Sequence, residues 1–259
     1  MMRLRLAVVL GVGLLVAATA SIARAEDDDP TAWHLTFTPY LWAAGLYGDV
    51  TVNGVDASLD ASFLDILDNT DTLVGLQGHV EVTRGRLGAY GDFFYVKTKV
   101  EDAGRTGLDV TNRMWFIEFG AQYRLVDTTI DRVPGITLDV YAGGRYSNLE
   151  LDLDTRGAPS LNRQVDWIDP IVGGRLGVHF SEHVFLLFAG DVGGFGVGSD
   201  LAWSVMGLFG YKWQGAGLEW AILAGYKALY QDYTTGSGAN RFRWDTTMRG
   251  PILGLSIRF

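Results

Sequence analysis

The sequence predicts an all-β fold, a single antiparallel up-and-down β-barrel that crosses a membrane. Three observations lead to this prediction. Bulky apolar residues alternate with polar or small ones over segments long enough to cross a lipid bilayer. After residue 25 no apolar run reaches the roughly 20 residues that a membrane-spanning helix needs. The chain has 34 glycines but six prolines, and 12% of its residues are aromatic. This composition is typical of β-barrels and β-sandwiches.

The alternation is clear in "MWFIEFGAQYRL", residues 114–125. One face of a strand here carries Trp115, Ile117, Phe119, Ala121, Tyr123 and Leu125, whereas the other carries Glu118, Gln122 and Arg124 among smaller or apolar residues. A helix would mix the two sets on every face, but a strand separates them. The same pattern recurs in residues 168–180, 201–213 and 218–230, with aromatic residues near both ends of the apolar face. A transmembrane barrel requires such an outward apolar band, about 25 Å tall and edged by aromatic girdles, around a polar interior.

Counting the segments predicts ten strands, although eight or twelve strands remain possible. The strands are expected at residues 33–43, 73–83, 87–100, 113–126, 136–149, 167–180, 184–197, 201–214, 218–232 and 244–259. Connections after even-numbered strands are mostly short, and those after odd-numbered strands are mostly long. Bacterial barrels alternate short periplasmic turns with long external loops, which places both termini in the periplasm.

The first long connection, residues 44–72, leaves two alternatives open. "VNGV" (52–55) favours a type I′ hairpin, which would either extend the first two strands above the membrane or form an extra pair. Ser62 and Asp65 resemble a capping box, so a short helix is expected after the hairpin.

Residues 1–25 have the pattern of a signal peptide: Arg3 and Arg5, then an apolar stretch, then Ala23-Arg24-Ala25. We therefore expect residues 26–259 to form one barrel domain. The chain has no cysteine, which excludes disulfides and thiolate chemistry. Its 30 acidic against 21 basic residues argue against a nucleic-acid partner, because phosphate binding needs clustered Lys and Arg.

If the bulky faces contact lipid, acidic and basic side chains share the lumen. Unpaired charge is costly in a narrow lumen, so we expect these side chains to form an ion-pair network. Its predicted members are Glu81, Asp92, Glu118, Arg124, Asp139, Arg145, Asp169, Arg175, Asp191, Lys212, Glu219 and Lys227. "HFSEH" (179–183) has the spacing of a zinc-protease motif, but it straddles a predicted turn and not a helix. We expect no catalytic residues, no metal site and no cofactor.

The chain ends in "GLSIRF", with Gly254, Ile257 and the terminal Phe259. This ending resembles the C-terminal signature of Gram-negative outer-membrane β-barrel proteins, a terminal aromatic preceded by alternating hydrophobic residues that the barrel-assembly machinery reads. "FTPYLWAAGLYGDVTVNG" (37–54) is similar to the start of a family of uncharacterised outer-membrane barrels. These resemblances imply an outer-membrane location, with the assembly machinery, outer-membrane lipid and lipopolysaccharide as partners.

Two functions follow from the sequence as expectations. The first is a closed barrel with a structural or surface-interaction role in the cell envelope, and not an enzyme. The alternative is a narrow, porin-like channel for small solutes or ions.

Overall fold

The computed structural model describes residues 32–259, apart from 104–107, 130–133 and 156–160. The predicted signal peptide therefore lies outside the described residues. Twelve strands, one short α-helix and one 3₁₀ turn make up the described part. They are β1 (Trp33–Trp42), β2 (Gly45–Val52), β3 (Val55–Ala61), α1 (Phe63–Asp68), β4 (Thr72–Arg84), β5 (Leu87–Ala103), β6 (Leu108–Asp127), β7 (Gly135–Thr155), β8 (Leu161–His179), β9 (Val184–Gly193), β10 (Leu201–Gly215), β11 (Leu218–Thr235), η1 (Gly238–Asn240) and β12 (Phe242–Arg258).

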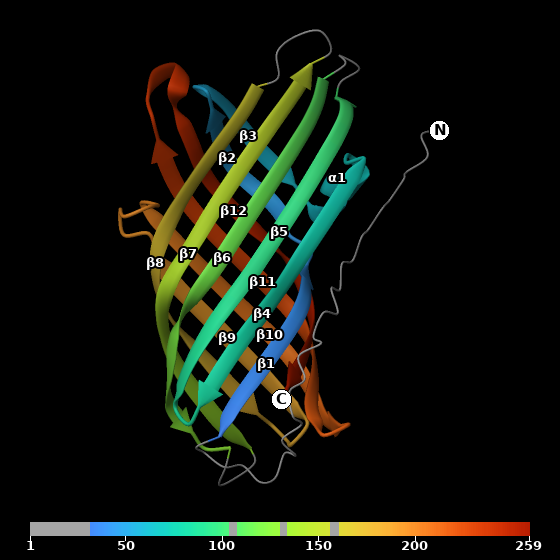
Figure 1. Ribbon diagram of the computed structural model, residues 1–259, viewed down its shortest axis with the longest axis vertical. Helices are drawn as coiled ribbons and strands as arrows, with labels where there is room; N and C mark the ends of the chain where they lie inside the picture. The colour runs from blue at the N-terminus through green and yellow to red at the C-terminus, as the bar shows by residue number, and fades with distance from the viewer. Residues whose placement is uncertain (1–31, 104–107, 130–133, 156–160) are drawn as a thin grey trace.

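Ten of these strands close into an antiparallel barrel (Figure 1). They follow one another around the wall in chain order, β1 then β4 to β12, and the barrel closes where β12 pairs with β1. Thr36 lies opposite Arg258 in this closing pair. The predicted ten-stranded up-and-down barrel is confirmed, and β2 and β3 are the extra pair that the first long connection left open.

The extra pair continues the wall beyond β1. β1 pairs with the C-terminal part of β12, and β2 then pairs with the preceding part, where Gly45 lies opposite Arg249. β2 turns into β3 at Asn53 and Gly54, whose φ values of 51° and 76° fit the predicted type I′ turn. The predicted capping box is present at α1, where Ser62 accepts a bond from the Asp65 amide and Asp65 accepts one from the Ser62 amide.

Several strands are longer than the sequence pattern predicts. β6, β7 and β8 extend toward the long connections by residues 108–112, 150–155 and 161–166, in which most of the charged side chains are acidic. The residues there still alternate, as in "LELDLD" (149–154), but the polar side chains face outward and the apolar ones inward, the reverse of the pattern in the apolar band. The predicted strands follow bulky outward residues, so they end where this reversal begins. β9 instead ends at Gly193, short of the predicted 197, because Gly194 and Phe195 adopt positive φ values of 87° and 50°.

The two ends of the barrel differ. The short connections at 85–86, 180–183 and 216–217 lie at one end, here called the turn end, together with Phe259. The other end is here called the loop end. β9 and β10 do not extend as far toward it as their neighbours, and β3 does not pair with β4. The wall there consists of two sheets, β4 to β8 and β11–β12–β2–β3. Trp167 and Tyr233 stack between them with ring centroids 4.3 Å apart.

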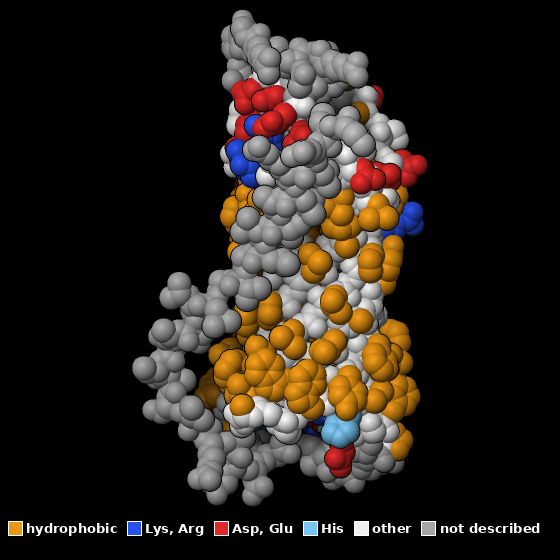
Figure 2. Space-filling model, turned by 90° about the vertical axis from the view of Figure 1, so that its right-hand side faces the viewer, with side chains coloured by type: hydrophobic (Ala, Val, Ile, Leu, Met, Phe, Trp, Pro, Cys, Tyr) orange, Lys and Arg blue, Asp and Glu red, His pale blue; other side chains and the backbone are white. Residues whose placement is uncertain are grey.

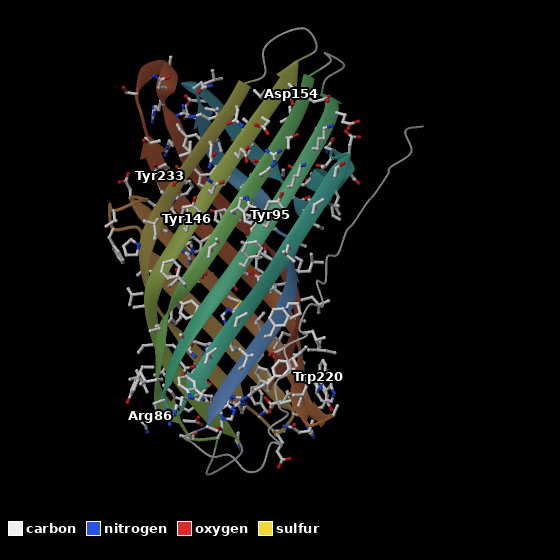
Figure 3. The ribbon with its side chains drawn as sticks, in the orientation of Figure 1. Arg86, Tyr95, Tyr146, Asp154, Trp220 and Tyr233 are labelled. Atoms are coloured by element: carbon white, nitrogen blue, oxygen red, sulfur yellow. The ribbon has the colours of Figure 1, made fainter. Side chains whose placement is uncertain are left out.

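The outer surface carries an apolar band around the middle and the turn end, with charged side chains above it (Figure 2). Large apolar side chains point outward along every strand of this band, and Phe119, Val205 and Leu253 are each about half exposed or more. Aromatic residues edge the band. Tyr95 and Tyr146 lie at its upper limit, and Trp220 lies near the turn end (Figure 3). No helix of the described chain is both long and apolar enough to cross a membrane.

Candidate functional site

The interior of the barrel is divided into an apolar half and a polar half. In the loop-end half, inward-facing side chains from both walls form one buried apolar cluster, here called the plug. Its largest members are Trp42, Phe94, Phe116, Trp167 and Trp244, each at most 5% exposed. Trp42 and Phe94 meet edge to face with ring centroids 5.5 Å apart, and Phe94 contacts Phe116 at the same distance.

The turn-end half is polar and hollow. A cavity of about 390 Å³ extends from the plug toward the turn end, where a second cavity of about 730 Å³ shares several of its lining residues. Leu208 and Ile252 belong to the plug and also line the first cavity, so this cavity borders the plug. One wall of the cavity is apolar, with Leu187, Met206 and Leu223 from β9 to β11. The opposite wall, from β4 to β8, carries most of the charged side chains.

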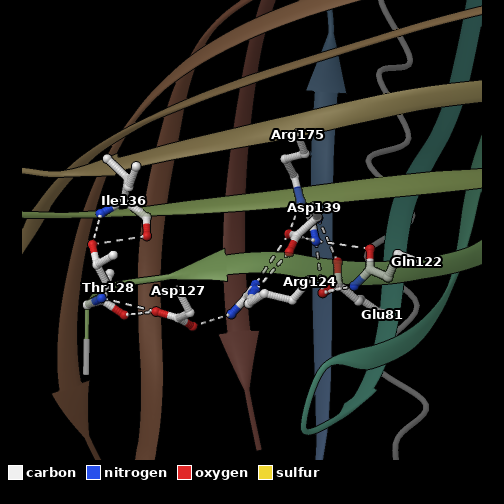
Figure 4. Close-up of polar contacts among 9 residues, drawn as sticks. Glu81, Gln122, Arg124, Asp127, Thr128, Ile136, Asp139 and Arg175 are labelled. Atoms are coloured by element: carbon white, nitrogen blue, oxygen red, sulfur yellow. Dashed lines mark hydrogen bonds and ion pairs between the residues drawn. The ribbon is translucent and has the colours of Figure 1, made fainter. Parts of the chain in front are cut away.

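One ion-pair cluster lies in the polar half near the turn end (Figure 4). Arg175 Nη1 bonds to Glu81 Oε2 at 2.7 Å, and Arg175 Nη2 bonds to Asp139 Oδ2 at 3.0 Å. Arg124 Nε donates to the other Asp139 oxygen at 2.8 Å and Arg124 Nη1 contacts Asp127 at 3.0 Å. Gln122 bridges the cluster, since its amide nitrogen donates to Glu81 and its oxygen accepts from Arg175. Four strands, β4, β6, β7 and β8, are fastened together by these contacts.

A second cluster lies deeper, against the plug. Arg145 is fully buried and bonds to Glu118 at 2.8 Å and to Asp191 at 2.9 Å. Each carboxylate lies on a different strand, so one guanidinium joins β6, β7 and β9. Two carboxylates around one guanidinium leave this trio with a net charge of −1.

Two side chains, Tyr40 and His79, contact Asp92 in the same region. Tyr40 Oη donates to Asp92 Oδ1 at 2.7 Å, and His79 Nδ1 lies 3.3 Å from Asp92 Oδ2. His79 also lies 3.6 Å from Glu81, which connects Asp92 to the turn-end cluster.

The structure places the predicted network residues in different surroundings. The turn-end cluster contains Glu81, Arg124, Asp139 and Arg175. The deeper cluster contains Glu118, Arg145 and Asp191, and Asp92 contacts Tyr40 and His79 nearby. A separate ion pair joins Lys212 to Glu219 at 3.4 Å.

Asp169 and Lys227 make no ion pair among the described residues. The Asp169 carboxylate is fully buried and accepts bonds from Trp167 Nε1, the Ser199 amide and hydroxyl, and Gln231 Nε2. It therefore fastens the 194–200 connection to the wall. The ammonium of Lys227 lies 5.2 Å from the centre of the Trp42 ring. These two residues are polar supports of the plug and not members of a salt bridge.

Several site residues were absent from the sequence prediction. The phenols of Tyr40, Tyr90 and Tyr141 line the cavity, and Tyr141 Oη lies 3.4 Å from Asp191. The plug itself was not predicted either. Its signal is the run "MWFI" (114–117), where both faces are apolar: Met114 and Phe116 enter the plug, whereas Trp115 and Ile117 face outward.

The C-terminal residues lie in the closing seam. Ile257 lies opposite both Phe37 and Trp220, and Gly254 lies opposite Tyr40 and Leu223. The Phe259 amide donates to the Leu35 carbonyl at 2.9 Å, and the Phe259 ring is half exposed.

The loop-end surface is acidic. Asp56, Asp60, Asp65, Asp68 and Asp71 lie on β3, α1 and the segment before β4. The hydroxyl and amide bonds from Ser62 hold the pKa of Asp65 below its usual value. No group of three or more His, Asp or Glu in the described residues has a geometry that could hold a metal ion.

Comparisons with known proteins add a fold likeness. No protein-family model and no curated protein matches this chain. One similar solved structure is that of Ail, the attachment invasion locus protein of Yersinia pestis, in complex with the heparin analogue sucrose octasulfate. Its sequence is 11% identical to this chain and the TM-score is 0.38. The match covers 88% of this chain and 98% of Ail. The monoaromatic hydrocarbon channel CymD is 8% identical with a TM-score of 0.24, covering 89% of this chain and 90% of CymD. A FadL homologue of Pseudomonas aeruginosa is 8% identical with a TM-score of 0.25, covering 88% and 90%. Likenesses of this size do not assign a function to this chain.

Proposed function

We propose that the protein is an integral barrel of the outer membrane of a Gram-negative bacterium, with its turn end and both termini in the periplasm. The outward apolar band supports insertion into lipid, because a soluble barrel would leave this surface in water. The closed wall satisfies the backbone hydrogen bonds that lipid cannot accept or donate. The resemblance of "GLSIRF" to an assembly signature and the alternation of short turns with long connections support the orientation.

We further propose that the barrel is closed and that it acts through its loop end, in a structural or surface-interaction role. The observation that carries this proposal is the plug. Water and ions crossing the barrel would have to pass the packed side chains of Trp42, Phe94, Phe116, Trp167 and Trp244, and such a section excludes them unless the core loosens. The two sheets that extend beyond the apolar band offer a rigid surface outside the membrane.

A narrow channel is the second candidate. The cavity that leads from the turn end to the plug supports it, because about 390 Å³ holds water and small solutes. A conducting state would require the plug to move, whereas the closed barrel requires no movement.

Planar-bilayer recording of refolded protein distinguishes the two candidates. We expect the wild-type barrel to insert and to show no steady conductance. A triple variant, Trp42→Ala with Phe94→Ala and Phe116→Ala, removes the centre of the plug and is expected to conduct. Heat-modifiable migration on gels shows that each variant is folded. A steady open level for the wild-type protein would overturn the closed-barrel proposal in favour of the channel.

A further inference from the structure

The outward face of β5 and β6 carries a pair of basic side chains at the upper limit of the apolar band. Lys97 and Arg113 lie directly opposite each other in the register of the two strands. Both point away from the lumen, because the residues next to them in the chain, Val96 and Met114, pack with the plug. In Figure 2, basic side chains (blue) lie next to acidic ones (red) above the apolar band.

An aromatic pair lies directly beneath the two bases. Tyr95 and Trp115 are opposite each other one pleat closer to the turn end, and their ring centroids are 4.2 Å apart. Tyr and Trp occupy the boundary between acyl chains and headgroups in membrane proteins. Lys97 and Arg113 therefore lie at the height of the lipid headgroups, if the barrel inserts as proposed above.

Among the described residues, Lys97 has no counter-charge of the kind that its neighbours have. Lys99 Nζ bonds to Glu101 at 2.7 Å, and Arg113 Nη1 bonds to Glu150 at 3.0 Å and to Asp152 at 2.6 Å. Lys97 makes no ion pair or hydrogen bond with any described residue. Residues directly opposite each other on neighbouring strands have Cβ atoms about 5 Å apart, so one anion can contact both Lys97 and Arg113.

Arg113 has further donors that make no bond to the described part of the chain. Both of its carboxylate partners contact Nη1, so Nε and Nη2 have no hydrogen-bond partner among the described residues. A phosphate offers several oxygen acceptors at once, and a guanidinium and an ammonium side by side suit it.

We propose that Lys97 and Arg113 bind the phosphate of an outer-leaflet lipid, with the acyl chains lying against Tyr95, Trp115 and the apolar band below. The ligand class is a phosphorylated lipid and not free phosphate, because the bases lie next to an apolar surface that only a lipid covers. This inference rests on the proposed insertion of the barrel into the outer membrane.

The test compares Lys97→Gln with Lys99→Gln in protein refolded into neutral detergent. The two positions lie on the same strand and face, and they differ in that Lys99 is one pleat higher and already paired with Glu101. Binding of dioleoyl phosphatidic acid, dioleoylglycerol and inorganic phosphate is measured by native mass spectrometry. We expect the wild-type protein and Lys99→Gln to bind phosphatidic acid about tenfold more tightly than dioleoylglycerol, since a charge-assisted phosphate contact is worth that factor. Lys97→Gln is expected to lose this preference and Lys97→Arg to keep it.

Other outcomes contradict the inference. Equal binding by Lys97→Gln and the wild-type protein excludes a role for Lys97. An equal loss in Lys99→Gln shows general charge attraction and no site. Equal binding of dioleoylglycerol by the wild-type protein shows that the phosphate is not recognised, and binding of inorganic phosphate alone shows an anion site that does not need lipid. Insertion into lipid vesicles is measured in parallel, because a wild-type protein that does not insert refutes the proposed function, whereas an inserted barrel without the preference refutes this inference alone.

Discussion

Arg145 shows at the scale of one residue how the polar half of the lumen depends on complete ion pairs. Its side chain is fully buried and lies between Glu118 and Asp191, which come from strands on either side. A buried ion pair contributes little net stability by itself, because burial removes water from both charges. Loss of one partner is costly, because the remaining charge stays buried without compensation.

We therefore expect Arg145→Met to destabilise the barrel strongly. The substitution leaves two carboxylates facing each other without their shared cation, and breaking a buried pair generally costs about 3–5 kcal/mol. Urea unfolding in lipid vesicles measures the loss. Arg86→Met serves as the control, because Arg86 is exposed in the short turn between β4 and β5. A loss of stability no greater than that of the control would show that water reaches and solvates Glu118 and Asp191.

The alternation predicts which residues face the lumen, but it does not predict their hydrogen-bond and ion-pair partners. The period of two places Asp169 and Lys227 on the inward face, and this is how they lie. Which donor reaches which acceptor depends on the register between strands and on the connections. Asp169 bonds to Ser199 because the 194–200 connection folds back onto β8, and this cannot be derived from the pattern of either strand.

At the scale of elements, the β2–β3 hairpin is the largest addition to the ten-stranded wall. Its turn contacts a second connection, since the Gly54 amide donates to the Arg241 carbonyl at 3.1 Å. A Cβ at position 54 would lie 2.6 Å from the Gly238 carbonyl oxygen, so only glycine allows this approach. The hairpin and the 236–241 segment therefore support each other at the loop end.

We expect Gly54→Ala to loosen this contact without unfolding the barrel. Amide hydrogen exchange at residues 51–56 and 236–241 should become faster, while the unfolding midpoint changes little. Gly217→Ala is the matched control, because Gly217 has a similar φ of 75° but no atom within 4 Å of an added Cβ. Faster exchange at residues 236–241 in both variants, or in neither, would contradict a specific contact between the turn and this segment.

The sequence identified the hairpin by "VNGV" and the helix by its capping box, because both are local signals. The lengths of β6, β7 and β8 could not be predicted in the same way. Beyond the apolar band their outward side chains face water, and the inward ones pack against the opposite sheet. The alternation therefore continues there with reversed polarity, apolar inward and polar outward, and a search for bulky outward residues does not detect it.

At the scale of the whole molecule, the outer surface determines the solvent in which the fold is stable. Phe119 is 49% exposed within the apolar band. We expect Phe119→Arg to reduce the free energy of folding into lipid vesicles by about 2–4 kcal/mol, the cost of a cation near the bilayer midplane. Asp154→Arg introduces the same side chain on the loop-end part of β7, outside the band, and should fold like the wild-type protein. Equal effects of the two substitutions would show that the band does not contact lipid.

The plug marks the limit of prediction at this scale. Alternation assigns one face to lipid and the other to the lumen, and it led to the expectation of a polar interior throughout. The loop-end half instead buries Trp42, Phe94, Phe116 and Trp244 on the inward face. Opposite walls of the barrel contribute these side chains, so their packing depends on contacts between residues far apart in the chain.

Both edges of β12 pair with other strands of the barrel, and this has a consequence for biogenesis. It pairs with β11 on one side and with both β1 and β2 on the other. Until the last 18 residues of the chain are available, three other strands have an open edge, and the wall remains a curved sheet whose first and last strands cannot meet. Open edges pair readily with other chains, and closure over so long a stretch of sequence is intrinsically slow. A nascent chain that stops inside β12 would therefore lack both this strand and the β12–β1 pairing that closes the barrel. It would remain an aggregation-prone intermediate that depends on chaperones.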